Sequence, residues 1–128
     1  MSTLGPVSRP TKILLVDDER DFLDPVAFQL KAEGYAVVAT TDSLATVKLV
    51  DAEAPDVVVL DNRMPGADGP ETLKEIRKRH PGLPVIIMTA FIEDTRSDEV
   101  NSCGPTGIYY KGEDTSVMME LIRSALKK

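Results

Sequence analysis

Reactive and charged side chains directly follow four short apolar runs of the sequence. These are Asp17 and Asp18 after residues 12–16 (KILLV), Asp61 after residues 57–60 (VVVL), Thr89 after residues 85–88 (VIIM) and Lys111 after residues 107–110 (GIYY). Carboxylates that cluster without a cation repel one another and raise one another's pKa. Oxygen ligands at this density suit a hard divalent cation such as Mg²⁺, which takes one or two carboxylates and shares its other positions with water and phosphate. If the fold brings these groups together, they form a site for a phosphoryl group.

The position of each residue suggests its role in such a site. Asp17 and Asp18 would hold the metal ion, and Lys111 would add a movable positive charge. Thr89 would donate its hydroxyl. Asp61 lies centrally between Thr89 and Lys111, so it would be the nucleophile that accepts a phosphoryl group as an aspartyl phosphate.

The runs at 12–16, 57–60 and 85–88 are continuous and rich in β-branched residues, which is typical of strands that are covered on both faces. We expect strands at 12–16, 36–40, 57–60, 85–88 and 107–110. Helical spacing of apolar residues predicts helices at 19–33, 43–53, 70–79, 93–102 and 114–126. Strict alternation of strand and helix predicts one open parallel sheet in an α/β fold, with helices on both faces.

Such a sheet would bring the candidate residues to one edge. In the five-stranded order 2-1-3-4-5 the first and third strands are neighbours, and ligands bind at the carboxyl ends of the strands. A strand spacing of about 4.8 Å then places Asp17 and Asp18 beside Asp61.

Composition excludes several other classes of protein. The 128 residues suffice for one ordinary domain, and the net charge of −6 opposes direct binding to nucleic acid or anionic lipid. One cysteine, Cys103, excludes an intramolecular disulfide and a cysteine-based zinc site, and the one histidine, His80, has no nearby partners for a catalytic or metal site. No apolar run approaches the length of a membrane span, so we expect a cytoplasmic protein.

Each candidate also has a purely structural interpretation when it is taken alone. The acidic run 17–19 would suit capping and dipole compensation at a helix start, and Asp61 would suit a capped turn. Thr89 would be a strand-end hydroxyl and Lys111 a solvated charge. The coincidence of all of them at one sheet edge, in the order that the chemistry needs, favours a functional site.

Four segments closely resemble the receiver domains of two-component response regulators. They are KILLVDDE (12–19), VVVLDNRMPGADG (57–69) with the spacing D-x-x-M-P-x-x-D-G, VIIMTA (85–90) and YYK (109–111). The resemblance covers residues 12–126 and implies a flavodoxin-like, doubly wound sheet of five parallel strands with five helices.

The same resemblance implies the chemistry and the ligand set. Asp61 would accept the phosphoryl group of a phosphohistidine from a sensor histidine kinase or a phosphotransfer protein. The resemblance assigns Mg²⁺ to Asp18, Asp61 and the backbone carbonyl of Arg63, with Asp17 acting mainly through a metal-bound water, and assigns the phosphate oxygens to Thr89 and Lys111. Phosphorylation would then bias a two-state equilibrium.

Two positions near the last strand depart from the family pattern. Gly112 stands where the family usually has a proline, and Ile108 stands where it usually has the switch tyrosine or phenylalanine. Tyr109 or Tyr110 would take over the aromatic role, or would be strand packing. The candidates for transmitting the signal are therefore Thr89, Ile108, Tyr109 and Tyr110.

These observations lead to a phosphoacceptor module that acts through a partner and only assists its own phosphorylation and dephosphorylation. The alternatives are a degenerate receiver that binds its partner without phosphorylation, and a small Mg²⁺-dependent phosphohydrolase. We expect a flexible lead-in over residues 1–10 and the receiver domain over residues 11–128. Besides the kinase, the expected partners are an output domain that would follow this chain and a second copy of this chain. Nucleic acid and membrane are not expected partners.

Overall fold

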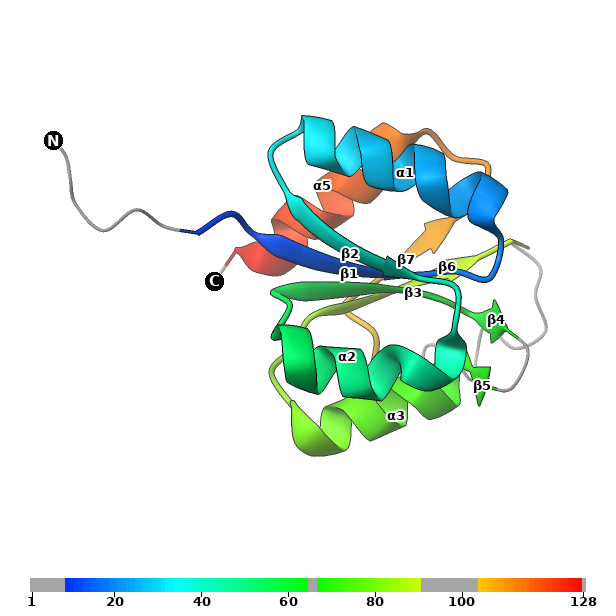
Figure 1. Ribbon diagram of the computed structural model, residues 1–128, viewed down its shortest axis with the longest axis vertical. Coiled ribbons are helices and arrows are strands. Elements are labelled where there is room, and N and C mark those ends of the chain that lie inside the picture. The colour runs from blue at the N-terminus through cyan, green and yellow to red at the C-terminus, as the bar shows by residue number, and fades with distance from the viewer. Residues whose placement is uncertain (1–8, 65–66, 91–103, 128) are drawn as a thin grey trace, which may run out of the picture.

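A five-stranded parallel sheet forms the middle of the structure (Figure 1). The computed structural model describes residues 9–64, 67–90 and 104–127. The sheet strands are β1 (Lys12–Val16), β2 (Ala36–Thr40), β3 (Val57–Asp61), β6 (Val85–Thr89) and β7 (Gly107–Tyr110). Their order in the sheet is β2-β1-β3-β6-β7. Counted along the chain this is the predicted order 2-1-3-4-5, and all pairs are parallel.

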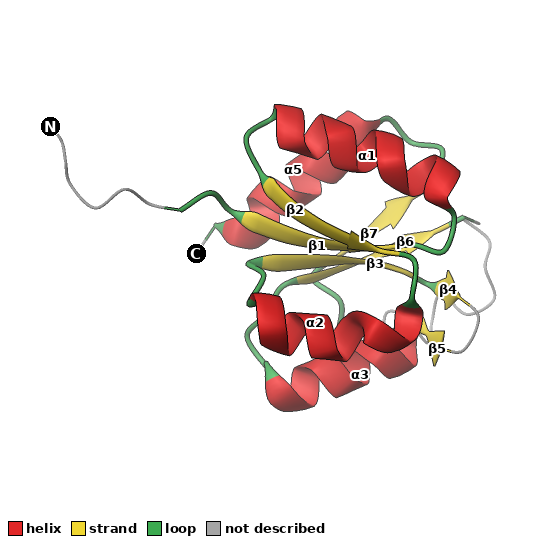
Figure 2. Cartoon of the chain, viewed as in Figure 1, coloured by secondary structure: helices red, strands yellow, loops and turns green. Residues whose placement is uncertain are grey.

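Helices cover both faces of this sheet (Figures 1 and 2). They are α1 (Arg20–Ala32), α2 (Thr46–Glu53), α3 (Gly69–Arg79) and α5 (Thr115–Leu126). Helices α1 and α5 lie on one face, and α2 and α3 lie on the other. Because successive side chains of a strand alternate, Ile13 and Leu15 pack in the cluster below α1 and α5, whereas Leu14 and Val16 pack in the cluster above α2 and α3. This explains why the strands are continuous apolar runs.

Helix α1 is one residue shorter than predicted at each end and α5 begins one residue later, and the other differences lie before α2 and at the start of α3. The predicted helix 43–53 is a 3₁₀ turn (Ser43–Ala45) followed by α2, and the Asp42 carboxylate caps the turn by accepting from the Leu44 N–H at 3.0 Å. In a continuous helix over 43–53, Leu44 would share the core-facing stripe with Val47 and Val50, but its side chain is 70% exposed. The tighter 3₁₀ turn rotates it away from the stripe that an α-helix would produce. At the start of α3 the helix begins one residue earlier than predicted, at Gly69. The predicted helix 93–102 lies outside the described residues.

A short antiparallel pair of strands was not predicted. Strands β4 (Arg63–Met64) and β5 (Ala67–Asp68) follow the carboxyl end of β3, and the Gly69 N–H then donates to the Asn62 carbonyl at 2.8 Å. Strands of two residues show no periodic pattern, so the sequence gives no signal for them. The pair leads the chain from the end of β3 into α3.

Replacing Gly69 by alanine is expected to lower the free energy of unfolding by about 1–2 kcal/mol. An added Cβ atom would lie 3.0 Å from the Asn62 Cα and from its Oδ1, and Asn62 is buried. The matched control is Gly82→Ala, because no described atom would lie within 4 Å of that Cβ. Urea denaturation measures both variants, and an equal loss at the two glycines would contradict the close contact.

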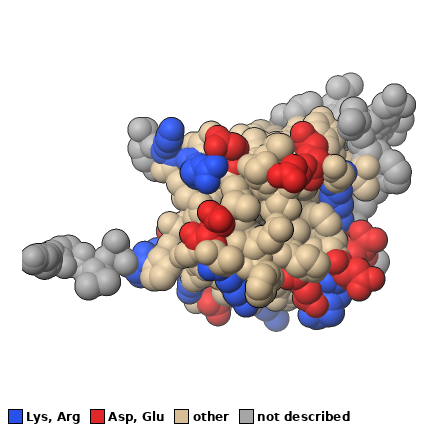
Figure 3. All heavy atoms as spheres, turned by 90° about the horizontal axis from the view of Figure 1, so that it is seen from above, with Lys and Arg blue, Asp and Glu red and all other residues tan. Residues whose placement is uncertain are grey.

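The surface over α1 and α5 carries acidic and basic side chains interspersed with uncharged ones (Figure 3). The negative net charge of the chain, −6, is therefore not gathered into one acidic patch on this face. Within residues 9–64, 67–90 and 104–127, we find no helix with the length and apolar character needed to cross a membrane.

Candidate functional site

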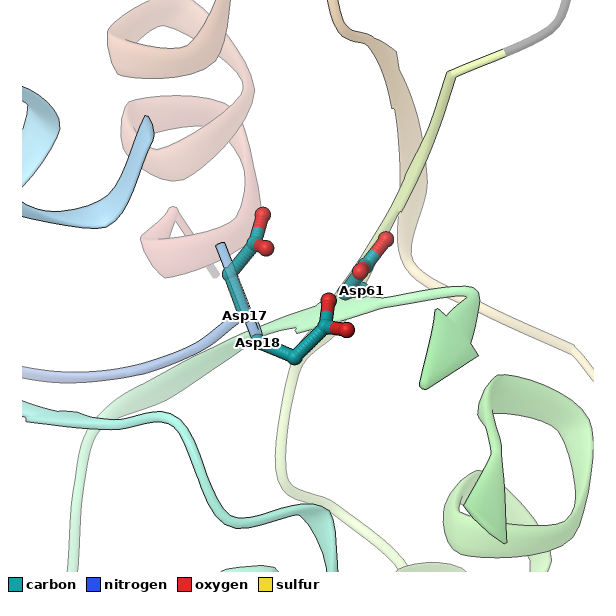
Figure 4. Close-up of side chains that lie close together, drawn as sticks. All are labelled: Asp17, Asp18 and Asp61. Carbon is teal, nitrogen blue, oxygen red and sulfur yellow. The ribbon is translucent and has the colours of Figure 1, made fainter. Parts of the chain in front are cut away.

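Three carboxylates meet at the carboxyl ends of β1 and β3 (Figure 4). One oxygen from each of Asp17, Asp18 and Asp61 lies within 4.8 Å of the others. The register of the sheet produces this meeting, because Val16 of β1 pairs with Leu60 of β3 and the aspartates come next. Asp17 is fully buried and Asp61 is 6% exposed, whereas Asp18 is exposed at the mouth of the site.

The Lys111 ammonium lies among these carboxylates. Its Nζ is 2.6 Å from Asp17 Oδ2, 3.3 Å from Glu19 Oε1 and 3.5 Å from Asp61 Oδ1. The Lys111 side chain is only 11% exposed, so water screens its interactions with Asp17 and Asp61 weakly, whereas the Glu19 side chain is 67% exposed. Among the described residues, one ammonium therefore faces several carboxylates, which leaves an excess of negative charge at the site.

Burial, more than this excess of charge, raises the pKa of two of the aspartates. Burial, followed by the charge of Asp17, raises the pKa of Asp61 to about 7, against the opposing effect of Lys111. Burial also raises the pKa of Asp17, although the Lys111 ammonium and the Glu19 N–H partly oppose it. Burial alone would lower the pKa of Lys111, but the hydrogen bond to Asp17 and the charge of Asp61 outweigh burial and raise it. The all-oxygen donor set and its unbalanced charge fit a hard divalent cation.

Thr89 is the last residue of β6, next to the acidic cluster. Asp61 pairs with Met88 across β3 and β6, so Thr89 lies one residue further along the neighbouring strand. The Thr89 side chain is buried, and its carbonyl accepts the Lys111 N–H at 2.8 Å. The backbone thus ties Lys111 to the end of β6, while a phosphate contact of the Thr89 hydroxyl stays a prediction.

Arg63 lies in β4, two residues after Asp61, and its backbone pairs with Asp68. This places its main chain directly beyond the acidic cluster. The role of its carbonyl as a metal ligand stays a prediction.

The three candidates on β7 have different surroundings. Ile108 packs against the cluster on the α2 and α3 face, while Tyr109 is buried in the cluster on the α1 and α5 face. The Tyr109 hydroxyl donates to the Glu113 carbonyl at 2.5 Å, which makes this residue part of the core and of the turn after β7. Tyr110 is half-buried. Gly112 has a φ of +110°, which proline does not adopt, so this turn is built differently from the usual family turn.

Phe22 is a site residue that the sequence prediction did not include. The Lys111 Nζ lies 4.8 Å from the centroid of its ring, which is a cation–π contact. Phe22 fits the apolar stripe of α1, so its spacing indicated only core packing. The sequence feature that could have identified Phe22 is its place in the first turn of the helix that follows the acidic run 17–19.

Comparisons with known proteins agree with this architecture. A family model described as the response regulator receiver domain matches residues 13–126. A DNA-binding response regulator of the LuxR family from Staphylococcus aureus is 28% identical, with a TM-score of 0.84 over 91% of this chain and 99% of that chain. A response regulator receiver domain protein from Clostridium thermocellum is 27% identical, with a TM-score of 0.84 over 91% of this chain and 94% of that chain.

A CheY-like response regulator receiver domain protein from Methanospirillum hungatei is similar at 25% identity. Its TM-score is 0.85, over 91% of this chain and 94% of that chain. The family match covers nearly the whole chain, and the acidic pocket of Asp17, Asp18 and Asp61 is consistent with a phosphoacceptor site. The chain therefore belongs to the response regulator receiver domains, which are modules of two-component signalling rather than turnover enzymes.

Proposed function

We propose that Asp61 accepts a phosphoryl group from a sensor histidine kinase or a phosphotransfer protein. The observation that carries this assignment is the difference between the two buried carboxylates, Asp17 and Asp61. Both oxygens of Asp17 are engaged, Oδ2 by Lys111 Nζ at 2.6 Å and Oδ1 by the Glu19 N–H at 2.8 Å. Asp61 lies beside them with a longer contact of 3.5 Å to Lys111 and retains some exposure. Its carboxylate is the better placed nucleophile.

The transfer is a simple displacement at phosphorus. An oxygen of Asp61 bonds to phosphorus, the bond from phosphorus to the imidazole nitrogen of the phosphohistidine breaks, and that nitrogen keeps the electron pair. Lys111 and the hydroxyl of Thr89 would then bind the phosphoryl oxygens. Burial keeps these contacts strong, because few waters compete for them.

Mg²⁺ is the proposed cofactor of this step. Asp18, Asp61 and the backbone carbonyl of Arg63 would hold the ion, and Asp17 would act through a bound water. When bound, a divalent cation neutralises charge on the phosphoryl group and on the acidic pocket. The donor chemistry supports this assignment, since three carboxylates lie within 4.8 Å of one another.

Intact-mass spectrometry after incubation with acetyl phosphate and Mg²⁺ tests the proposal. We expect one phosphoryl adduct on the wild-type protein and none on Asp61→Asn. The matched control is Asp24→Asn, which removes an exposed carboxylate of α1 and is expected to keep the adduct.

Three results would contradict the assignment. They are an adduct that persists in Asp61→Asn, a wild-type protein without any adduct, and labelling that is unaffected by EDTA. Sustained release of phosphate from small phosphoesters would instead favour the phosphohydrolase.

A further inference from the structure

We propose that Phe22 is a positioning residue that, together with Glu19, holds the Lys111 ammonium beside α1 in the unphosphorylated protein. This arrangement opposes movement of the Lys111 ammonium toward a phosphoryl group on Asp61. The inference rests on the proposed function of Asp61, and it adds a specific restraint on the lysine that this function needs.

The contacts of Lys111 are strongest on one side of the site. Its Nζ is 2.6 Å from Asp17 and 3.3 Å from Glu19, but 3.5 Å from Asp61. The Phe22 ring lies on the same side, with its centroid 4.8 Å from Nζ. Asp17, Glu19 and Phe22 all belong to the segment that leads from β1 into α1, whereas Asp61 ends β3. The ammonium is therefore held mainly by the β1–α1 junction.

The surroundings make the ring contact effective. Cation–π attraction is significant within about 6 Å of the ring centroid and increases when the cation is shielded from water. The Lys111 side chain is 11% exposed, so the ammonium is largely shielded. Phe22 itself is half-buried and packs against the core cluster on the α1 and α5 face, which fixes the position of its ring.

A phosphoryl group on Asp61 would change the balance of these attractions. It would bring new negative charge to the β3 side, and the ammonium would have to exchange its contacts with Glu19 and Phe22 for contacts with phosphoryl oxygens. A group that stabilises one of two arrangements shifts the equilibrium by the difference between its interactions with the two. Removing the ring or the Glu19 charge should therefore favour the phosphoryl-bound arrangement.

Helix α1 offers a matched control for the ring. Phe28 is a second phenylalanine of α1, and it is 74% exposed. Among the described residues, the cation–π contact of Lys111 is with Phe22. Phe28→Leu thus removes a ring from the same helix without touching the lysine, and Phe22→Tyr keeps an aromatic face at the site.

The experiment combines two measurements on Phe22→Leu, Phe22→Tyr, Glu19→Gln and Phe28→Leu. The first is the NMR shift of the Lys111 CεH₂ protons in the metal-free protein, which reports the ring directly. The second is the affinity for beryllofluoride in the presence of Mg²⁺, as a probe that mimics the phosphoryl group. Thermal unfolding of each variant verifies that it is folded.

We expect Phe22→Leu to move the Lys111 signals to lower field and to tighten beryllofluoride binding by about 2- to 5-fold, the size of an ordinary cation–π contact. Glu19→Gln should also tighten binding, because it removes a competing charge. Phe22→Tyr and Phe28→Leu should change neither quantity. A purely structural role of Phe22 would lower stability without moving the lysine signals.

Several results would overturn the inference. Unchanged Lys111 signals in Phe22→Leu would show that the ring does not contact the ammonium. Moved signals with unchanged or weaker beryllofluoride binding would show that the contact does not oppose the phosphoryl-bound arrangement. Both results concern Phe22 alone, because the wild-type protein still binds the probe. A wild-type protein that binds no beryllofluoride and gains no phosphoryl adduct would overturn the proposed function as well.

Discussion

Replacing Asp61 by asparagine is expected to raise the free energy of unfolding by about 3–4 kcal/mol at pH 8 in the absence of divalent cations. Burial and the charges of Asp17 and Asp18 raise the pKa of Asp61 from 3.8 to about 7. At pH 8 the folded protein must therefore hold an ionised carboxylate in a place that favours the neutral form. Asparagine has nearly the same shape and carries no charge, so it relieves this repulsion.

The sign of the effect follows from proton binding. Between about pH 4 and pH 7 the folded protein retains a proton on Asp61 that the unfolded chain has released. The stability that the protonated group supplies is present below the unfolded pKa and is lost as the pH rises through the folded pKa of about 7. The difference between wild type and Asp61→Asn should thus be small near pH 4, open across this range, and be constant above it.

Urea denaturation at several pH values in EDTA measures this dependence. The control is Asp24→Asn, which changes the same chemical group on the exposed surface of α1. Mg²⁺ should stabilise the wild-type protein more than the Asp61→Asn variant, because it offsets the same charge. A stability gain that does not vary with pH would exclude the electrostatic explanation.

Replacing Lys111 by methionine is expected to lower the free energy of unfolding by about 3 kcal/mol at pH 8, the usual result of removing one partner of a buried ion pair. Asp17 is fully buried, and the Lys111 Nζ at 2.6 Å is the cation that compensates its charge. Methionine preserves most of the apolar stem that packs near Phe22. The variant therefore tests the ammonium rather than the volume of the side chain.

The pH dependence of this loss also has a definite sign. The carboxylates raise the pKa of Lys111 above its ordinary 10.5, so its stabilising effect is fully present at pH 8. Without the ammonium, Asp17 and Asp61 are expected to bind protons more tightly, and protonation at lower pH replaces the missing charge. The loss should therefore be smaller at pH 5 than at pH 8.

A double-mutant cycle connects the two predictions. Lys111→Met should be less damaging in the Asp61→Asn background, because that background holds one carboxylate fewer. The control is Lys74→Met, which removes an exposed ammonium of α3. If Lys111→Met were neutral at pH 8 in the wild-type background, the ion pair with Asp17 would not stabilise the fold.

The strands and the acidic cluster could be predicted because both depend on strong local patterns. Continuous β-branched runs located β1, β3 and β6, two further apolar runs located β2 and β7, and the strand order alone brought Asp17 to Asp61. The exposure of Leu44 could not be predicted, since a 3₁₀ turn and an α-helix begin with the same capping residue. The contact of Phe22 with Lys111 joins positions far apart in the chain, and an apolar side chain in a helical stripe gives no sign of a charged neighbour.

The surroundings of β7 show a similar limit. Alternation along a strand predicts that Ile108 and Tyr109 face opposite sides of the sheet, as they do. It does not predict that the Tyr109 hydroxyl reaches the Glu113 carbonyl, because this bond depends on the path of the turn at Gly112. Local periodicity therefore assigns the faces of the sheet but not the bonds beyond its edge.

The burial of β1, β3 and β6 on both faces has a consequence for how this protein can diverge. Packing admits only apolar side chains at the interior positions of these strands. Substitutions there are therefore limited to apolar residues of different shape. The first polar side chains on the far side are Asp17, Asp61 and Thr89. Selection on packing and selection on chemistry thus act mainly on adjacent stretches of chain, while the charges at the strand ends also affect stability. Substitutions at the strand ends can therefore change reactivity or specificity while the packed strands that carry these residues stay the same.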